Sequence, residues 1–185
     1  MPVTAQQALS VYTQADLLYT QDQVEAALTR MAAEISAALH DSDPIVLSVM
    51  TGGMIPAGKL LTQLHFPLQL DYIHATRYTG KTQGGTLHWL VKPTYPLHDR
   101  VVLVIDDILD EGLTLAAIVA DCKAAGARAV YSAVLVDKLH DRKNGMRADF
   151  VGVSVADRYV FGYGMDYKGY LRNAPGIYAV KEEAN

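Results

Sequence analysis

The chain contains little cysteine, no long apolar run and no excess of positive charge. Its one cysteine, Cys122, cannot form an internal disulfide, which fits a reducing compartment such as the cytoplasm. No apolar run approaches the roughly 20 residues of a membrane-spanning helix, and the first residues lack the basic and apolar regions of a signal peptide. The formal net charge of −4 argues against sequence-independent binding to nucleic acid. We therefore expect a cytoplasmic protein with no nucleic-acid partner and no membrane contact.

Paired histidines are also missing. None of the six histidines has another at the spacing of metal ligands. The histidines assigned on this ground to surface or structural roles are His40, His65, His74, His88, His98 and His140.

The remaining composition is that of an ordinary globular domain. The 185 residues are 50% hydrophobic and 19% charged, and this length favours a single domain, residues 1–185, with a sizeable core. A capping box at Thr20-Gln-Asp-Gln23 precedes apolar residues at helical spacing. The predicted helices are 21–40, 56–64 and 114–125, and the predicted strands are 45–50, 68–76, 87–91, 101–105, 129–136, 151–155 and 159–161. Their alternation predicts an α/β fold with a mostly parallel central sheet flanked by helices.

The most informative segment runs from Val101 to Thr114. Five β-prone apolar residues lead into Asp106 and Asp107, Asp110 follows three residues later, and Glu-Gly-Leu-Thr precedes a helical run. In α/β proteins, ligands bind where the carboxyl end of a strand passes to a helix, and the helix start offers unpaired N–H groups to a phosphate. Paired acids suit sugar hydroxyls or a hard cation such as Mg²⁺, whereas helix capping alone needs one acid. The segment therefore predicts a site for a phosphorylated sugar.

This segment resembles the signature with which type I phosphoribosyltransferases bind phosphoribosyl pyrophosphate (PRPP). The spacing is matched without a gap: an apolar strand, two acids, two apolar residues, Asp, a small or polar residue, Gly, any residue, Thr. The resemblance implies that Asp106 and Asp107 hold the ribose hydroxyls. The residues that it implies around the 5′-phosphate are Glu111, Gly112, Leu113 and Thr114. Thr is common in the family where this chain has Glu111, whose carboxylate we expect to point away from the phosphate.

A more specific resemblance, to the hypoxanthine-guanine phosphoribosyltransferases, covers roughly residues 45–175. Its most specific part is the stretch from Ala148 to Arg172. The resemblance implies that Asp110 contacts N7 of the base and is the general base. It also implies that Lys138, placed directly after the strand 129–136, donates to the 6-oxo group and so selects 6-oxopurines over adenine.

Four residues of the C-terminal stretch have implied counterparts. Tyr159 would stack on the purine, and the main chain of Val160 would read its exocyclic edge. Asp166, on the purine side, matches a carboxylate linked to Mg²⁺, and Arg172 matches a cation facing the pyrophosphate. Asp106 and Asp166 are the two candidate metal ligands.

Two further loops have counterparts in the same family. Thr51, Gly52 and the next glycine resemble the loop whose backbone amides grip the pyrophosphate, where many members carry Lys at the position of Thr51. Arg77 and Tyr78 resemble the start of a mobile lid, which would cover residues 78–86.

The resemblance implies a type I phosphoribosyltransferase fold, with a core of about residues 40–160 and a small hood from about 1–20 and 160–185. It implies transfer of 5-phosphoribosyl from PRPP to hypoxanthine or guanine with Mg²⁺ as cofactor, in a homodimer or homotetramer. Three alternatives stay open: a sister enzyme for xanthine or a pyrimidine, a non-catalytic PRPP-sensing regulator, and a sugar-phosphate-binding protein unrelated to PRPP.

Overall fold

The computed structural model describes residues 3–77 and 87–181. Its helices are α1 (Ala5–Gln14), α2 (Gln21–Leu39), α3 (Met54–Leu61) and α4 (Leu113–Ala124). Its strands are β1 (Asp16–Thr20), β2 (Ile45–Met50), β3 (Gln69–Arg77), β4 (Leu87–Val91), β5 (Val101–Leu109), β6 (Ala129–Leu139), β7 (Phe150–Ala156), β8 (Val160–Phe161) and β9 (Gly176–Ala179).

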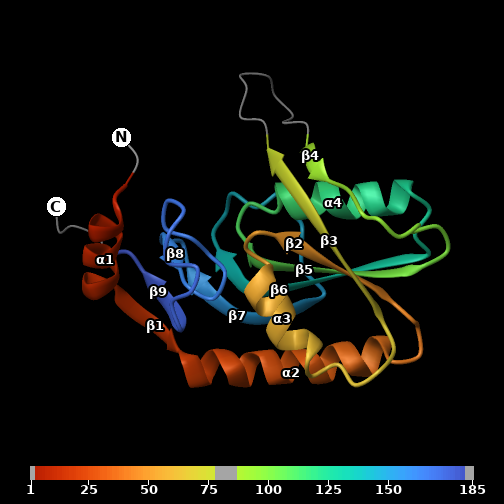
Figure 1. Cartoon of the computed structure of the whole chain (residues 1–185), viewed down its shortest axis with the longest axis horizontal. Coiled ribbons are helices and arrows are strands. Elements are labelled where there is room, and N and C mark those ends of the chain that lie inside the picture. Colours follow the sequence, from red (N-terminus) through yellow and green to blue (C-terminus); the bar gives the residue numbers. More distant parts are fainter. Residues whose placement is uncertain (1–2, 78–86, 182–185) are drawn as a thin grey trace.

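The central sheet has the strand order β4-β3-β2-β5-β6-β7. All neighbouring pairs are parallel except β3 and β4, which pair antiparallel. The carboxyl ends of β2, β5 and β6 therefore meet at one edge of the sheet (Figure 1). The predicted mostly parallel α/β sheet is confirmed.

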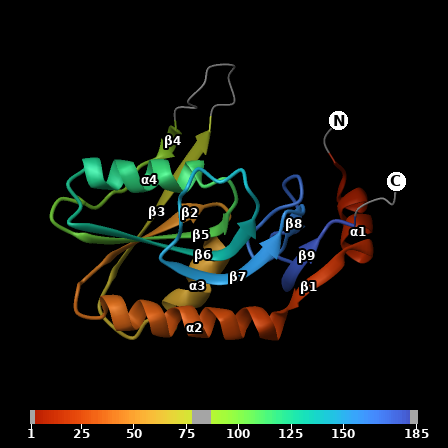
Figure 2. The ribbon, with the colours of Figure 1, turned by 180° about the vertical axis from the view of Figure 1, so that it is seen from behind.

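Helices cover both faces of this sheet, so its central strands, such as β2 and β5, are buried on both sides. In β5 the apolar side chains alternate: Leu103 and Ile105 pack in the core beneath α2 and α3, whereas Val102 and Val104 pack in the core beneath α4. Figure 1 and the view from behind in Figure 2 show α2 and α4 on opposite sides of the sheet. A strand buried on both faces has a continuous apolar sequence, and Val101-Val-Leu-Val-Ile105 has this pattern.

The start of α2 follows from its capping box. The Gln23 N–H donates to Thr20 Oγ1 over 3.3 Å, and the Thr20 N–H donates to Gln23 Oε1 over 2.9 Å. These bonds satisfy N–H groups that the first turn leaves unpaired, as the sequence predicts.

A second, three-stranded sheet of order β1-β9-β8 brings the two terminal segments together. It lies at one end of the central sheet, beside α1 (Figures 1 and 2). Aromatic contacts hold it: the rings of Phe161 and Tyr178 stack at 5.6 Å, and Tyr12 of α1 meets Tyr178 edge-on at 5.0 Å. The sheet places residues 160–172 over the end of the central sheet where the site lies.

Several boundaries differ from the predicted ones. Helix α3 begins at Met54, before the predicted start at Pro56, because proline is tolerated in a first helical turn, where its missing N–H has no partner. Strand β5 continues through the acidic pair to Leu109, and β6 continues to Leu139. In both cases pairing with a neighbouring strand outweighs the weak strand preference of the acidic residues.

Candidate active site

A cavity of about 410 Å³ lies at the carboxyl ends of β2 and β5. Most of the residues predicted to bind PRPP line it, together with the predicted general base. The predicted residues on its wall are Thr51, Gly52, Asp106, Asp107, Asp110, Glu111, Gly112, Leu113, Thr114, Asp166 and Arg172. The fold thus gathers segments that are up to 121 residues apart in sequence, from Thr51 to Arg172, around one hollow.

The start of α4 gives this cavity an anion-binding end. Gly112 is the N-cap residue with a φ of 84°, in the left-handed region that favours glycine. A Cβ at Gly112 would lie 2.6 Å from Asn144 Oδ1, so the loop packs closely there. Because glycine has no side chain to cap the helix, the first N–H groups and the positive dipole end of α4 face the cavity beside Thr114.

Asp106, which is partly buried, and Asp107, which is buried, form an acidic pair beside this end. Each is at the end of β5 rather than in a loop, which corrects the predicted strand boundary. The Asp107 N–H donates to Asp106 Oδ1 over 2.9 Å, and the Ile108 N–H donates to Asp107 Oδ1 over 2.8 Å. Burial and the neighbouring charge of Asp107 raise the pKa of Asp106 well above its ordinary value, and burial raises the pKa of Asp107. The pair therefore favours a cation or hydroxyl donors as partners.

Two glycines pack closely beside Asp107, and one of them, Gly52, lines the cavity. A Cβ at Gly52 would lie 2.0 Å from Asp107 Oδ2, and a Cβ at Gly164 would lie 2.1 Å from the Gly52 carbonyl oxygen. The peptide bond between Met50 and Thr51 is cis. The glycine loop predicted to grip pyrophosphate is thus in contact with the acidic pair.

Arg172 supplies positive charge beside the acidic pair. Its guanidinium lies 2.8 Å from Asp166 Oδ1 and 3.7 Å from Asp107 Oδ2. The other oxygen of Asp166 accepts the Gly169 N–H over 2.7 Å. Arg172 and Asp166 therefore both line the cavity and are in direct contact with each other.

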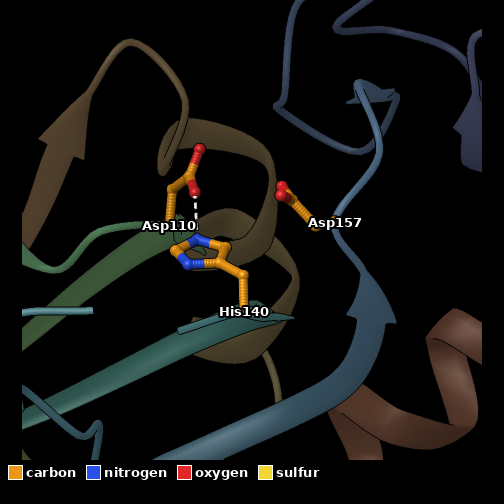
Figure 3. Close-up of side chains that lie close together, drawn as sticks. All are labelled: Asp110, His140 and Asp157. Carbon is orange, nitrogen blue, oxygen red and sulfur yellow. Dashed lines mark hydrogen bonds and ion pairs between the residues drawn. The ribbon is translucent and has the colours of Figure 1, made fainter. Parts of the chain in front are cut away.

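Asp110 is held by two donors from the end of β6, Lys138 and His140; Figure 3 shows the contact with His140. Lys138 Nζ donates to Asp110 Oδ2 over 2.9 Å, and His140 Nε2 lies 2.6 Å from Asp110 Oδ1. Burial disfavours the carboxylate, but the hydrogen bonds from Lys138 and His140 outweigh it, so the pKa of Asp110 lies below its ordinary value. Asp110 is thus a charged acceptor at neutral pH.

One prediction about this cluster is wrong in detail: Lys138 lies within β6 and not after it, because β6 is longer than its apolar run. Of the two roles predicted for His140, surface or structural, burial contradicts the first, since its side chain is only 4% exposed and contacts the predicted general base. The signal was present, since side chains two residues apart near the end of a strand project to the same face, as Lys138 and His140 do.

The residues predicted to bind the purine are less concentrated. Tyr159 is 49% exposed and its ring meets Tyr167 edge-on at 5.5 Å, whereas Val160 is buried in β8 opposite Ala179. Neither lines the 410 Å³ cavity. Arg77 ends β3, and Tyr78 and the predicted lid 78–86 lie outside the described residues.

Asp110, His140 and Asp157 each bring a possible metal-ligand atom within 4.8 Å of the others (Figure 3). However, Arg142 already binds Asp157 through two bonds of 2.7 and 3.0 Å, and Lys138 binds Asp110. Two cations in contact with these carboxylates oppose a third. The donor set of Asp106 and Asp166 has oxygen atoms only, which Mg²⁺ prefers, although Asp166 would have to exchange its ion pair with Arg172, at 2.8 Å, for the metal.

The comparisons with known proteins agree with this geometry. The pattern of the phosphoribosyl transferase domain matches residues 14–168, so the class is that of the phosphoribosyltransferases. The chain is 31% identical to the hypoxanthine-guanine-xanthine phosphoribosyltransferase of Tritrichomonas foetus, over 90% of this chain and 91% of that protein. It is 29% identical to the hypoxanthine-guanine phosphoribosyltransferase of Bacillus subtilis (strain 168), over 89% of this chain and 92% of that one.

Solved structures give the same result. A hypoxanthine-guanine phosphoribosyltransferase from Bacillus anthracis superimposes with a TM-score of 0.85 at 27% identity, covering 90% of this chain and 98% of that one. The chain belongs to the hypoxanthine-guanine branch of the phosphoribosyl transferase family. The predicted family and fold are confirmed.

Within residues 3–77 and 87–181, no helix is both long and apolar enough to cross a bilayer.

Proposed function

We propose that this chain transfers the 5-phosphoribosyl group from PRPP to N9 of hypoxanthine or guanine, which releases pyrophosphate and forms the nucleotide. The observation that carries the proposal is the arrangement of one segment within one cavity: an acidic pair, then an ionised Asp110, then an open helix start. In this order along the chain, they match the ribose hydroxyls, the base and the 5′-phosphate. The names of the T. foetus and B. subtilis relatives support the same substrates.

In the proposed reaction, N9 of the base bonds to C1′ as the bond from C1′ to the pyrophosphate oxygen breaks. Asp110 accepts the proton that leaves N7, which its low pKa allows because the carboxylate is ionised at neutral pH. Arg172 and the amides of the Gly52 loop stabilise the negative charge that grows on the leaving pyrophosphate. Lys138 turns from Asp110 to the 6-oxo group.

We propose Mg²⁺ as the cofactor, held by Asp106 and Asp166. The raised pKa of Asp106 supports this, since a buried acidic pair without a cation is electrostatically unfavourable. When bound, the ion offsets charge on the pyrophosphate.

We also propose a homodimer or homotetramer in the cytoplasm. An apolar groove of about 470 Å³ between α3 and β3 supports self-association, since Met54, Leu70 and Tyr72 are each about half exposed there. Light scattering during gel filtration should give a multiple of the 20.2 kDa chain mass, and a smaller multiple for Leu70→Asp. A monomer in the unsubstituted protein would contradict this assembly.

The function is tested by mixing the protein with PRPP, Mg²⁺ and each of hypoxanthine, guanine, xanthine, adenine and uracil. Nucleotide and pyrophosphate should appear with hypoxanthine or guanine, and omission of Mg²⁺ should abolish transfer. Turnover of xanthine or uracil alone would identify the sister enzyme. PRPP binding without turnover of any base would identify a regulator.

A further inference from the structure

His140 is the buried neighbour of an exposed catalytic carboxylate. Its side chain is 4% exposed, whereas that of Asp110 is 46% exposed, and the two lie 2.6 Å apart. His140 follows directly on β6, and its ring lies against Asp110 in Figure 3. A buried ring at the end of a strand is a rigid support for a carboxylate in a neighbouring loop.

The hydrogen bonds of the ring determine which nitrogen carries the proton. The Arg142 N–H donates to His140 Nδ1 over 3.1 Å, so Nδ1 is an acceptor. Nε2 therefore carries the hydrogen and donates it to Asp110 Oδ1. The neutral ring is sufficient for this bond, and the carboxylate remains the acceptor.

The loop that fixes the ring is itself anchored. Arg142 forms an ion pair with Asp157 through two hydrogen bonds, of 2.7 and 3.0 Å. Asp157 directly follows β7. The charged groups that face His140 are thus Asp110 from the β5–α4 loop, Lys138 from β6, Arg142 from its own loop and Asp157 beyond β7. Opposite charges alternate among them, which favours the observed arrangement.

The two oxygens of Asp110 have different donors. Lys138 binds Oδ2 and His140 binds Oδ1. If the proposed function holds, Lys138 leaves Asp110 when it binds the 6-oxo group of a purine, and His140 is then the remaining one of these two donors. A carboxylate that lost both donors would have a higher pKa and no partner to fix its orientation, and would be a less well placed proton acceptor.

We infer that His140 is a positioning residue, which keeps Asp110 oriented and ionised while Lys138 binds the base. The inference rests on the proposed function for its catalytic consequence and on the geometry alone for its effect on Asp110. It assigns no contact between His140 and the substrate.

The test compares His140→Leu, which removes the donor, with His140→Gln, whose amide nitrogen can occupy the position of Nε2. In His140→Leu, kcat should fall about 10- to 100-fold, as expected for a lost hydrogen bond to a charged group, while the KM for PRPP changes little. The acid limb of the pH profile of kcat/KM should move to higher pH, because the pKa of Asp110 rises without the donor. His140→Gln should restore most of kcat and the original profile.

His65→Leu is the matched control, because His65 is exposed and does not line the cavity. Its activity and pH profile should equal those of the unsubstituted protein. Thermal unfolding of every variant checks that the chain is folded. Unchanged kcat and pH profile in His140→Leu would overturn the inference, as would a His140→Gln variant as impaired as His140→Leu.

Carboxyl-carbon NMR of Asp110 separates this inference from the proposed function. Its pKa should be higher in His140→Leu than in the unsubstituted protein, whether or not any base is turned over. If no base is turned over but the pKa rises, the proposed function fails and the role of His140 toward Asp110 stands. If turnover occurs and the pKa does not rise, the inference fails alone.

Discussion

Asp106 and Asp110 lie four residues apart in one segment, yet their surroundings shift their pKa values in opposite directions. Asp106 is next to another buried acid, and its pKa is raised. Asp110 is next to Lys138 and His140, and its pKa is lowered. The difference teaches that one short segment can present two kinds of carboxylate. The surroundings of Asp106 favour an added cation, whereas hydrogen bonds from Lys138 and His140 keep Asp110 ionised, as its proposed role as a base requires.

Asp110→Asn should have the largest effect, because it removes the ionised acceptor and preserves the shape. We expect kcat to fall roughly 10²- to 10⁴-fold, the usual contribution of a general base, with PRPP affinity nearly unchanged. Steady-state kinetics and titration calorimetry measure the two quantities. Turnover equal to that of the unsubstituted protein would remove Asp110 from the mechanism.

Lys138→Ala should come next. It removes both a donor to Asp110 and the proposed contact with the 6-oxo group, so kcat/KM for hypoxanthine and guanine should fall about 10- to 100-fold. Adenine, which lacks the oxo group, serves as the comparison substrate. Equal use of 6-oxopurines before and after the change would refute the role of Lys138 in reading the base.

Asp106→Asn should separate stability from function. When the pKa of a carboxyl group is higher in the folded than in the unfolded chain, the group lowers the free energy of unfolding. The loss begins as pH rises above the unfolded-state pKa and is complete above the folded-state pKa. Removing that cost, on the order of 1 kcal/mol, should raise Tm by about 2–4 °C near pH 7.5. The gain should vanish below about pH 4, where Asp106 is protonated in both states.

In the same Asp106→Asn variant, binding of PRPP with Mg²⁺ should be weakened. Calorimetry with PRPP in the presence and absence of Mg²⁺ measures this. A lower Tm at neutral pH would show that the acidic pair stabilises the fold, contrary to its raised pKa.

Thr51→Lys should have the smallest effect. Thr51 is exposed and lines the cavity with the acidic pair. An added exposed cation should lower the KM for PRPP roughly two- to fivefold, the range of a solvated ion pair. Weaker PRPP binding at low salt would mean that this position does not face the phosphates.

Local patterns in the sequence predicted much of the framework and most of the cavity wall. The apolar runs of β2 and β5, the capping box at Thr20 and the acidic segment ending in Thr114 are each readable without knowledge of distant residues. Strand β4 was predicted at its observed bounds, 87–91.

What could not be predicted depends on long-range contacts. Strand β1 is stabilised by β9, about 160 residues later, and neither has a strong local signal. The contact of His140 with Asp110, 30 residues away on another element, was missed for the same reason, although its place two residues after Lys138 indicates the same face. The extension of β5 past Ile105 likewise depends on its pairing with β6.

The tight meeting of Gly52, Asp107 and Gly164 has a consequence for engineering. It joins the central sheet to the terminal sheet with no room for even a methyl group between the segments. Chimaeras that exchange residues 160–185 with those of a relative should fold only when both chains keep glycine at these two positions. Libraries aimed at new base preferences would therefore do best to vary the exposed rim near Tyr159 and leave this seam unchanged.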